Sequence, residues 1–555
     1  MPQPKTISLR ETDCLVLGGG ITGAGVARDA ATRGLRTMLI DADDFASGTS
    51  HVTSKLVHGG LRYLEQFRFR LVIEGSIERD RLLRRLAPNL VTPIRFLIPF
   101  QRRSLLRWLM VVTGLQVYGL IERIRWGRRT SAYGADRMRR DFPLLRRHPF
   151  GVTYWDAQTD DARLVLSTIR SASAAGAEVH NYTTLREAVF SDGWWNLTLA
   201  SPDRGTWHVR TQTIVNATGP WSPETAKRLG AAEPQLLWLK GTHILLDRPE
   251  QFGNDAIIIR SLRDMRSLWV IPWHNRLIVG ATESVYHGDL RDIHPTRDEV
   301  DDLFESTAHS FHDAGLTRRA ICGAYSGVRP ILRQPGVPEN RMSRDYRIEM
   351  DHARALVTVS GGKLTTFRRM AEHAVNAVQT ILGGAPATPE LRIRLRNQML
   401  WPGLARADAQ RLLQQLTPRA QRLQLAPGTL AHLVSHYGAD AALVLDDVAK
   451  DPESGRALFD GLPYTLAELA YVTRAEAVYH LLDLIKRRTP IYFLAGAGGS
   501  DRYPAIAAHI APILGWTVPR QEEEVALARR ELNADDDAIE NTVDETAAHT
   551  HRRPA

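Results

Sequence analysis

Four side chains suited to anion binding or proton exchange surround two glycines in the stretch SKLVHGGLRYLE, residues 54–65. The side chains are Lys55, His58, Arg62 and Tyr63, and the glycines are Gly59 and Gly60. Because glycine has no Cβ, the backbone at this point can approach a bulky ligand closely. The stretch is therefore a candidate binding site that places donors and cations beside a ligand.

Two arginines farther along the chain are suited to holding an anion. Arg329 lies in YSGVRP and Arg344 in SRDY, and a loop that contains proline and glycine separates them, so the two can converge. A planar guanidinium donates two parallel hydrogen bonds to a phosphate or a carboxylate. A surface salt bridge is the simpler interpretation of either arginine alone.

The N-terminal residues 13–41, DCLVLGGGITGAGVARDAATRGLRTMLID, have the pattern of a dinucleotide-binding unit. An apolar strand leads into Gly18, Gly20 and Gly23 in the spacing G-x-G-x-x-G, an alanine-rich helix follows, and a second strand ends in Asp41. In such units the glycines allow a tight turn, close approach of a pyrophosphate and close helix packing. The helix N-terminus attracts the pyrophosphate, and the acid accepts from a ribose hydroxyl.

Two later segments are expected to return to the same sheet. TIVNATGPW (213–221) is an apolar strand that ends in a Gly-Pro turn, and ALVTVSGGKLTTFRRMAEHA (355–374) is a strand, a Gly-Gly turn and a helix. In the second segment, Thr365 or Thr366 is placed to cap the helix. Together with the N-terminal unit, these segments predict a dinucleotide held by three separated parts of the chain, although each turn alone is unspecific.

Taken together, these motifs resemble those of the FAD-dependent respiratory sn-glycerol-3-phosphate dehydrogenases. The matching stretches, from about residue 12 to 375, are GGGITGAGVARDAATRGL, TSKLVHGGLRYLE, DDARLVL, VNATGPW, KGTHILL, VIPW, YSGVRP, SRDY and GGKLTTFR. The resemblance implies oxidation of sn-glycerol 3-phosphate to dihydroxyacetone phosphate, with hydride transfer from C2 to FAD and electrons passed to a membrane quinone. It also implies an α/β fold in which a Rossmann-type FAD-binding domain meets an antiparallel-sheet substrate domain, as in D-amino-acid oxidase.

The resemblance assigns roles to particular residues. Substrate binding falls to Arg62, Tyr63, Arg329, Arg344 and Lys363, with the two later arginines as the phosphate clamp. We expect the cofactor to contact Gly18, Gly20, Gly23, Asp41, Ser54, Lys55, His58, Gly59, Gly219, Gly361, Gly362, Leu364 and Thr365. Within this set, Lys55 and His58 are expected on the flavin side, where positive charge would stabilise the anionic reduced flavin.

An imidazole titrates near working pH and suits the group that takes the C2 hydroxyl proton. The resemblance implies that this group is His243, because KGTHILL matches the family's active-site stretch. Lys363 and His58 are alternatives, and Arg62 is expected to act beside the reacting centre. The sequence departs from the family in two places: GATE (280–283) stands where GTTD is common, and Asp41 where glutamate is often found. The acid in GATE is one methylene longer, which affects positioning rather than chemistry.

Other functions compete with this interpretation. A glycerol-3-phosphate oxidase that makes hydrogen peroxide would use the same residues, but the chain lacks the long insertion seen in such oxidases. An amino-acid or amine oxidase of the same fold would need a carboxylate clamp. A flavin-binding protein without catalysis would not need these arginines and His243 together, and the sequence shows no interleaved basic and aromatic platform for RNA.

Composition is that of a soluble globular protein in a reducing compartment. The chain has 555 residues, a net charge of +9 and only two cysteines, too few for a disulfide framework. We expect a cytoplasmic protein, peripheral on the inner face of the cell membrane, with no metal site. Residues 101–129, an apolar stretch flanked by arginines, are a candidate interfacial helix, and 368–382 are a second one.

The expected domain boundaries follow from these segments. The FAD-binding domain takes 10–75, 150–235 and 341–385, and the substrate domain takes 76–149 and 236–340, where alternating runs predict antiparallel strands. Residues 391–533 are expected to form an all-helical C-terminal domain for homodimerisation or stability, with 465–488 as its clearest helix, capped by Thr465 and Glu468. The acidic tail 534–555 is expected to be disordered.

Overall fold

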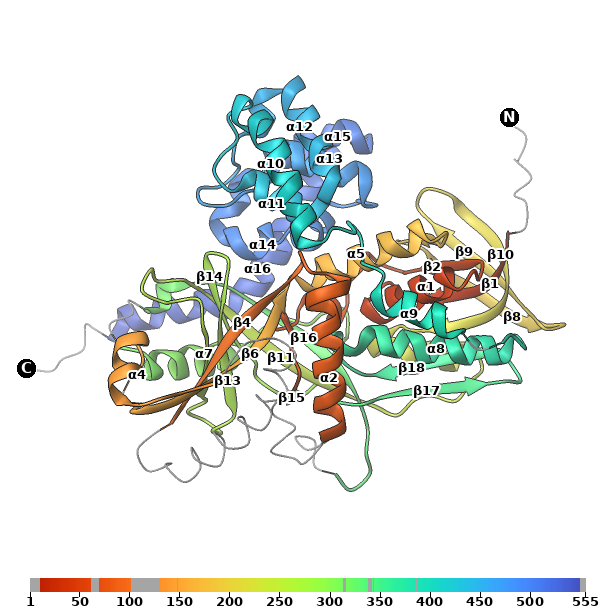
Figure 1. The fold of residues 1–555 in the computed structure, drawn as a ribbon, viewed down its shortest axis with the longest axis horizontal. Coiled ribbons are helices and arrows are strands. Elements are labelled where there is room, and N and C mark those ends of the chain that lie inside the picture. Colours follow the sequence, from red (N-terminus) through yellow and green to blue (C-terminus); the bar gives the residue numbers. More distant parts are fainter. Residues whose placement is uncertain are drawn as a thin grey trace, which may run out of the picture.

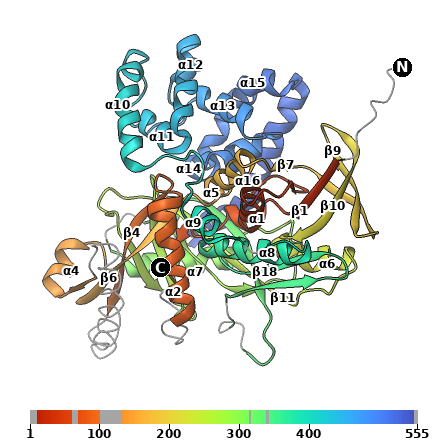
Figure 2. The same ribbon diagram turned by 45° about the vertical axis from the view of Figure 1, so that its right-hand side comes forward.

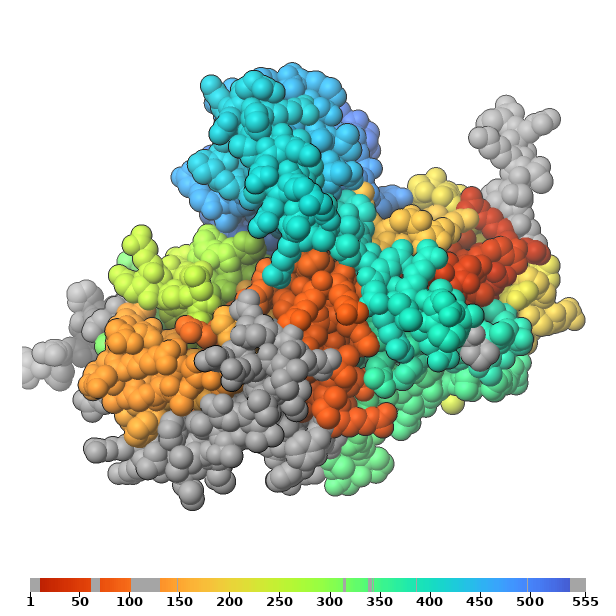
Figure 3. Space-filling model, viewed as in Figure 1, coloured from red at the N-terminus to blue at the C-terminus, as the bar shows by residue number. Residues whose placement is uncertain are grey.

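The computed structural model describes residues 10–60, 69–100, 130–146, 148–312, 316–337, 342, 344–385 and 387–549. Two sheets lie side by side, and Figure 1 shows a group of helices above the junction between them. In the space-filling view of Figure 3, these helices project as a lobe above the rest of the molecule.

The first sheet has parallel strands at its centre, in the order β17-β18-β10-β1-β2-β7. The strands are β1 (Arg10–Leu17), β2 (Thr37–Ile40), β7 (Glu178–His180), β10 (Gly205–Asn216), β17 (Tyr346–Asp351) and β18 (Leu356–Gly361), with β8 (Thr184–Ser191) and β9 (Trp194–Ser201) joined to β10. Residues 14–17 of β1 are buried, as expected for a central parallel strand covered on both faces. The two returning segments lie beside β1 as predicted, because β10 pairs with β1 and β18 pairs with β10.

Helices cover the first sheet. Helix α1 (Ile21–Thr32) packs against α5 (Asp161–Ala174) and α8 (Phe367–Ile381), and Figure 2 shows α8 lying along the sheet. The apolar face of α8 is buried in this packing through residues that include Met370, Ala374 and Val378. The interpretation of 368–382 as an interfacial membrane helix is therefore wrong, since its apolar face is already covered by the protein.

The second sheet is largely antiparallel, in the order β15-β11-β14-β13-β12-β4-β6-β3, with β16 on β11 and β5 on β6. Its strands are β3 (Leu56–Val57), β4 (Val91–Phe100), β5 (Ser131–Tyr133), β6 (Phe150–Thr159), β11 (Leu236–Asp247), β12 (Ala256–Arg260), β13 (Ser267–Trp273), β14 (Arg276–Gly280), β15 (Ser284–Val285) and β16 (Ile321–Leu332). Helices α2 (Phe69–Arg81), α4 (Ala135–Asp141) and α7 (Arg297–Ser310) accompany it. The expected FAD-binding segments 10–75 and 150–235 include β3 and β6, but these two strands pair in the second sheet and not in the FAD-binding sheet.

The C-terminal part is helical, as predicted. Its helices are α9 (Pro389–Asn397), α10 (Arg406–Arg422), α11 (Thr429–Tyr437), α12 (Ala441–Lys450), α13 (Leu466–Ala475), α14 (Ile491–Ala495), α15 (Tyr503–Leu514) and α16 (Val518–His549), with a further helical turn η11 (Asp483–Arg488). Thr465 caps α13 by accepting from the backbone N–H of Glu468 at 3.2 Å.

Two expectations for the helical part are wrong. The predicted helix 465–488 is interrupted after Ala475, because the Asp483 carboxylate accepts from the backbone N–H groups of Tyr479 and His480 and starts a new turn. The predicted disordered tail is helical as far as His549 in α16, whose residues Ala538 and Ile539 are buried against the second sheet.

Among the described residues, no helix is long and apolar enough to cross a bilayer. The candidate interfacial segment 101–129 lies outside the described residues.

Candidate functional site

The glycine loop leaves an open space at the N-terminus of α1. A Cβ on Gly23 would lie 1.8 Å from the carbonyl oxygen of Gly18, and Gly18 has φ of +101°, so both positions require glycine. A Cβ on Gly20, the N-cap of α1, would meet only the Ser50 Oγ at 3.2 Å. The helix N-terminus is thus accessible to an anionic group, and the loop fits a dinucleotide pyrophosphate.

Asp41 stands at the end of β2, next to the glycine loop. Its Oδ2 accepts from the Gly19 N–H at 2.6 Å and its Oδ1 accepts from the Asp43 N–H at 3.0 Å. Burial raises the pKa of Asp41 to about 7. The carboxylate is therefore held in a defined orientation at the sheet edge where a cofactor ribose would lie.

Lys55 is paired inside the protein. Its Nζ is buried, donates to the His51 carbonyl oxygen at 2.7 Å and to Asp161 Oδ1 at 2.5 Å, and lies 5.1 Å from the ring centroid of Phe493. Asp161 balances the charge of Lys55, and the place of Lys55 on the flavin side stays a prediction. Lys55 fixes the loop from inside.

The rest of the opening stretch lies against the Gly-Gly turn. Thr365 Oγ1 donates to the His58 carbonyl oxygen at 3.2 Å, and the Gly59 N–H donates to Asp156 Oδ1 at 3.0 Å. The His58 ring packs edge-on to Trp269, with 5.7 Å between ring centroids. Arg62 and Tyr63 lie outside the described residues.

His243 is buried on β11 between Ser54 and Tyr325. Its Nε2 lies 2.8 Å from Ser54 Oγ, and its ring stacks on Tyr325 with centroids 4.8 Å apart and planes 14° from parallel. Its Nδ1 is buried and has no hydrogen-bond partner among the described residues. Burial, followed by the nearby charges of Arg329 and Lys55, holds the pKa of His243 well below 6.5, so the imidazole is neutral and able to accept a proton.

Strand register places Arg329 close to His243. His243 pairs with Tyr325, Gly241 with Gly327 and Leu239 with Arg329 across β11 and β16, so these side chains share one face. The Arg329 guanidinium bends over Gly241, where a Cβ would lie 2.7 Å from its Nη2. At about 3.4 Å per residue, Gly241 lies about 7 Å along the strand from His243. That separation suits a short ligand with an anionic end and a hydroxyl.

The two arginines converge as predicted, and they do so on a carboxylate. Arg344 Nη2 lies 2.7 Å and Arg329 Nη1 lies 3.4 Å from the same oxygen, Oε2 of Glu283. Arg344 is only 8% exposed, and its Nη1 has no hydrogen-bond partner among the described residues. The site therefore holds a neutral imidazole and a pair of guanidiniums.

Comparison with known proteins identifies the family of this chain. The family model described as FAD dependent oxidoreductase matches residues 13–368, and the model described as the C-terminal domain of alpha-glycerophosphate oxidase matches residues 375–521. The chain is 34% identical over 535 residues to glycerol-3-phosphate dehydrogenase 2 of Mycobacterium bovis, covering 94% of this chain and 88% of the relative. The protein belongs to the FAD-dependent glycerol-3-phosphate dehydrogenase family.

Two further known proteins are similar to most of this chain. The chain is 32% identical over 502 residues to the D-erythritol 1-phosphate dehydrogenase of Brucella abortus, covering 89% of this chain and 96% of the relative. The glycerol-3-phosphate dehydrogenase of Bacillus halodurans, solved in complex with FAD, superposes with a TM-score of 0.76 at 25% identity, covering 95% of this chain and 96% of that one. FAD is thus the cofactor of this enzyme family, and the open glycine loop and Asp41 fit it.

The remaining residues predicted for the site lie at the ends of first-sheet strands. Gly361 and Gly362 have φ of +74° and +96°, and the Gly362 N–H donates to the Asp345 carbonyl oxygen at 3.0 Å. Lys363 and Leu364 follow at the start of the next helical turn, at the same end of the β17–β18 hairpin as Arg344. Gly219 has φ of +58° after β10, and no atom lies within 4 Å of a Cβ built there.

Sequence reasoning missed several residues of the site. Tyr325 lies within YSGVRP, but the motif predicts no role for it. Glu283 differs from the aspartate common in the family, but the sequence does not predict its contact with the two arginines. Asp161 and Gly280 gave no individual signal, although Gly280 pairs with His243 and its Cβ would lie 2.3 Å from the imidazole Cδ2. Their importance comes from strand pairing, which a linear motif does not show.

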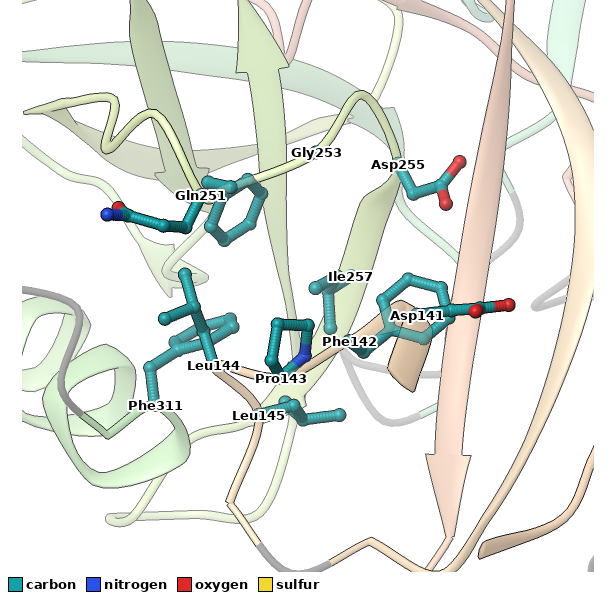
Figure 4. Close-up of a pocket in the computed structure, with 11 residues that line it drawn as sticks. Asp141, Phe142, Pro143, Leu144, Leu145, Gln251, Gly253, Asp255, Ile257 and Phe311 are labelled. Carbon is teal, nitrogen blue, oxygen red and sulfur yellow. The ribbon is translucent and has the colours of Figure 1, made fainter. Parts of the chain in front are cut away.

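A separate pocket lies in the second-sheet domain (Figure 4). Its lining includes Phe142, Leu145, Phe252, Ile257 and Phe311, with Asp141 and Asp255 at its edge. None of the predicted site residues contributes to it, so we assign it no part in the chemistry.

Proposed function

We propose that the protein oxidises sn-glycerol 3-phosphate to dihydroxyacetone phosphate and passes the electrons to a membrane quinone. The observation that carries the substrate assignment is the convergence of Arg329 and Arg344. The Arg329 guanidinium lies over Gly241, two residues along β11 from the neutral His243. This arrangement matches a short alcohol that ends in a phosphate. FAD, when bound, supplies the acceptor for the C2 hydride.

In this proposal the residues divide the work of binding and proton transfer. The two guanidiniums hold the phosphate through charge-assisted hydrogen bonds. Nδ1 of His243 takes the C2 hydroxyl proton while Nε2 donates to Ser54 Oγ, which fixes the ring. Lys363, Arg62 and Tyr63 are proposed to contact the substrate hydroxyls and phosphate.

The substrate assignment is tested by anaerobic bleaching of the flavin absorbance. We expect rapid bleaching by sn-glycerol 3-phosphate and none by glycerol at the same concentration. D-erythritol 1-phosphate is the second substrate to compare, because one relative is named for it. Faster bleaching by D-erythritol 1-phosphate than by sn-glycerol 3-phosphate would assign erythritol phosphate as the substrate instead. No bleaching by any of the three compounds would contradict the proposal.

The acceptor is a separate question, because an oxidase would share this site. We propose quinone, and expect turnover with a soluble quinone analogue to exceed oxygen consumption by at least tenfold. Stoichiometric hydrogen peroxide in air at a comparable rate would favour the oxidase alternative. Attachment to the inner membrane face and a homodimer remain part of the proposal, and are checked by vesicle cosedimentation and by light scattering.

A further inference from the structure

Glu283 occupies the meeting point of the arginine pair. Its Oε2 lies 2.7 Å from Arg344 and 3.4 Å from Arg329, and its side chain is 19% exposed. The carboxylate therefore neutralises one of the two cationic charges where a phosphate would have to bind. Arg344 Nη1 is buried and has no hydrogen-bond partner among the described residues.

The backbone before Glu283 is held firmly. The Thr282 N–H donates to the Thr242 carbonyl oxygen at 3.2 Å, and Thr282 Oγ1 accepts from the Thr242 N–H at 2.8 Å. Thr282 Oγ1 also donates to Glu299 at 3.3 Å, and Glu299 is paired with Lys240. Glu283 is thus a fixed counter-charge, unlike a surface acid on a free loop.

We propose that Glu283 determines specificity by competing with the substrate's anionic group for Arg329 and Arg344. This inference rests on the proposed function, which takes the two arginines as the phosphate clamp. A phosphate monoester carries about −1.5 to −2 charges at pH 7 and three acceptor oxygens. It can replace a single carboxylate on two guanidiniums, whereas a neutral polyol or a monoanionic hydroxy acid gains too little to do so.

A purely supporting role for Glu283 predicts the opposite sign. If the carboxylate only held the guanidiniums in place, its removal would release them and weaken anion binding. If it competes, its removal takes away the carboxylate that the two guanidiniums share and strengthens anion binding, because charges a few ångströms apart interact strongly in a partly buried site. The direction of the change therefore separates the two roles.

The test uses the FAD-loaded, full-length protein and its Glu283→Gln variant, which keeps the shape and removes the charge. Inorganic phosphate is titrated by calorimetry, and KM is measured for sn-glycerol 3-phosphate and for D-glycerate, a three-carbon alcohol with a carboxylate. We expect about tenfold tighter phosphate binding in E283Q. We also expect a smaller preference for the phosphate ester over D-glycerate than in the wild type.

The control variant is Glu349→Gln, which removes a carboxylate paired with Arg347 on β17, away from the clamp. It should leave phosphate binding unchanged, which excludes an effect of net charge alone. Unchanged or weaker phosphate binding in E283Q would overturn the inference. If E283Q fails to fold, Glu283→Asp replaces it, since withdrawing the carboxylate by one methylene should tighten phosphate binding to a smaller extent.

Failure of the inference is distinguishable from failure of the proposed function. The phosphate titration does not require turnover. A wild-type protein that binds phosphate through the clamp but is not bleached by sn-glycerol 3-phosphate would contradict the proposed reaction alone.

Discussion

His243 combines the properties that a proton acceptor needs with a fixed orientation. Ser54 holds one nitrogen, Tyr325 covers one face of the ring, and burial keeps the imidazole uncharged. A neutral imidazole is the form that accepts a proton, and the lowered pKa keeps it in this form at neutral pH while making it a weaker base than the free imidazole expected from the sequence.

Replacing His243 by Gln should slow flavin reduction by sn-glycerol 3-phosphate by about 10²–10⁴-fold, the range for losing a general base. In the wild type, the rate should stay constant as pH falls to 6.5 and decline only below it, because the depressed pKa delays protonation of the ring. Stopped-flow absorbance between pH 5 and 8 measures both. A wild-type decline centred above pH 6.5 would contradict this role.

The raised pKa of Asp41 predicts that cofactor binding depends on pH. A ribose hydroxyl donates best to the ionised carboxylate, and in the free protein the pKa of Asp41 is about 7. The dissociation constant of FAD should therefore rise about tenfold as pH falls from 8 to 6. Fluorescence titration of apoprotein measures it, and Asp41→Asn should remove most of this pH dependence while weakening binding.

At the scale of elements, the register of β11 with β14 and β16 builds the site. Gly280 pairs with His243 across β11 and β14. On the other side of β11, the Gly241–Gly327 pair separates the His243–Tyr325 pair from the Leu239–Arg329 pair. A shift of one residue would turn these side chains to the opposite face of the sheet. Strand geometry thus sets the spacing between His243 and Arg329, the proposed catalytic and anion-binding residues.

Gly280→Ala should perturb the chemistry, since the added Cβ would lie 2.3 Å from His243 Cδ2 and must displace the ring. We expect a fall of at least tenfold in the flavin reduction rate with the bound FAD retained. Gly323→Ala on β16 is the matched control, because its Cβ would meet Leu245 Cδ1 at an ordinary 3.4 Å. Equal rates in both variants would show that ring position is not limiting.

Local motifs predicted the parts of the fold that depend on neighbouring residues, and long-range contacts account for what was missed. The glycine loop, Asp41 and the returning strands follow from short patterns, whereas the predicted threonine cap of α8 is wrong, because Thr366 at its N-cap makes no side-chain capping hydrogen bond. The pairing of Lys55 with Asp161 and of Glu283 with two arginines depends on the way separated strands meet. The break in 465–488 depends on one carboxylate, Asp483, that bonds to backbone N–H groups outside a helix.

For the molecule as a whole, the helical domain is joined to the cofactor domain by buried charges. Asp44, three residues after Asp41, accepts from Arg488 Nη2 at 2.8 Å and from Arg487 Nε at 2.5 Å, and Asn181 donates to it at 2.8 Å. Asp44 and Arg488 are almost completely buried, and these arginines keep the pKa of Asp44 low.

Replacing Arg488 by Gln should destabilise the protein by about 3–5 kcal/mol, because it leaves part of a buried carboxylate network uncompensated. We expect FAD to be lost more readily as well, since the loop after Asp41 is released. Thermal unfolding and the flavin content of the purified variant measure these effects. Arg474→Gln, in a more exposed pair with Asp447, should change neither appreciably.

Phe493 of α14 packs against Tyr325 with ring centroids 5.3 Å apart, and Tyr325 in turn stacks on His243. The aromatic packing behind the His243 imidazole is therefore partly supplied by the helical domain. For protein engineering, this means that the helical lobe is not an exchangeable appendage. Chimaeras that swap it between relatives should inherit altered turnover along with altered stability, and libraries seeking new polyol phosphate substrates should include α14.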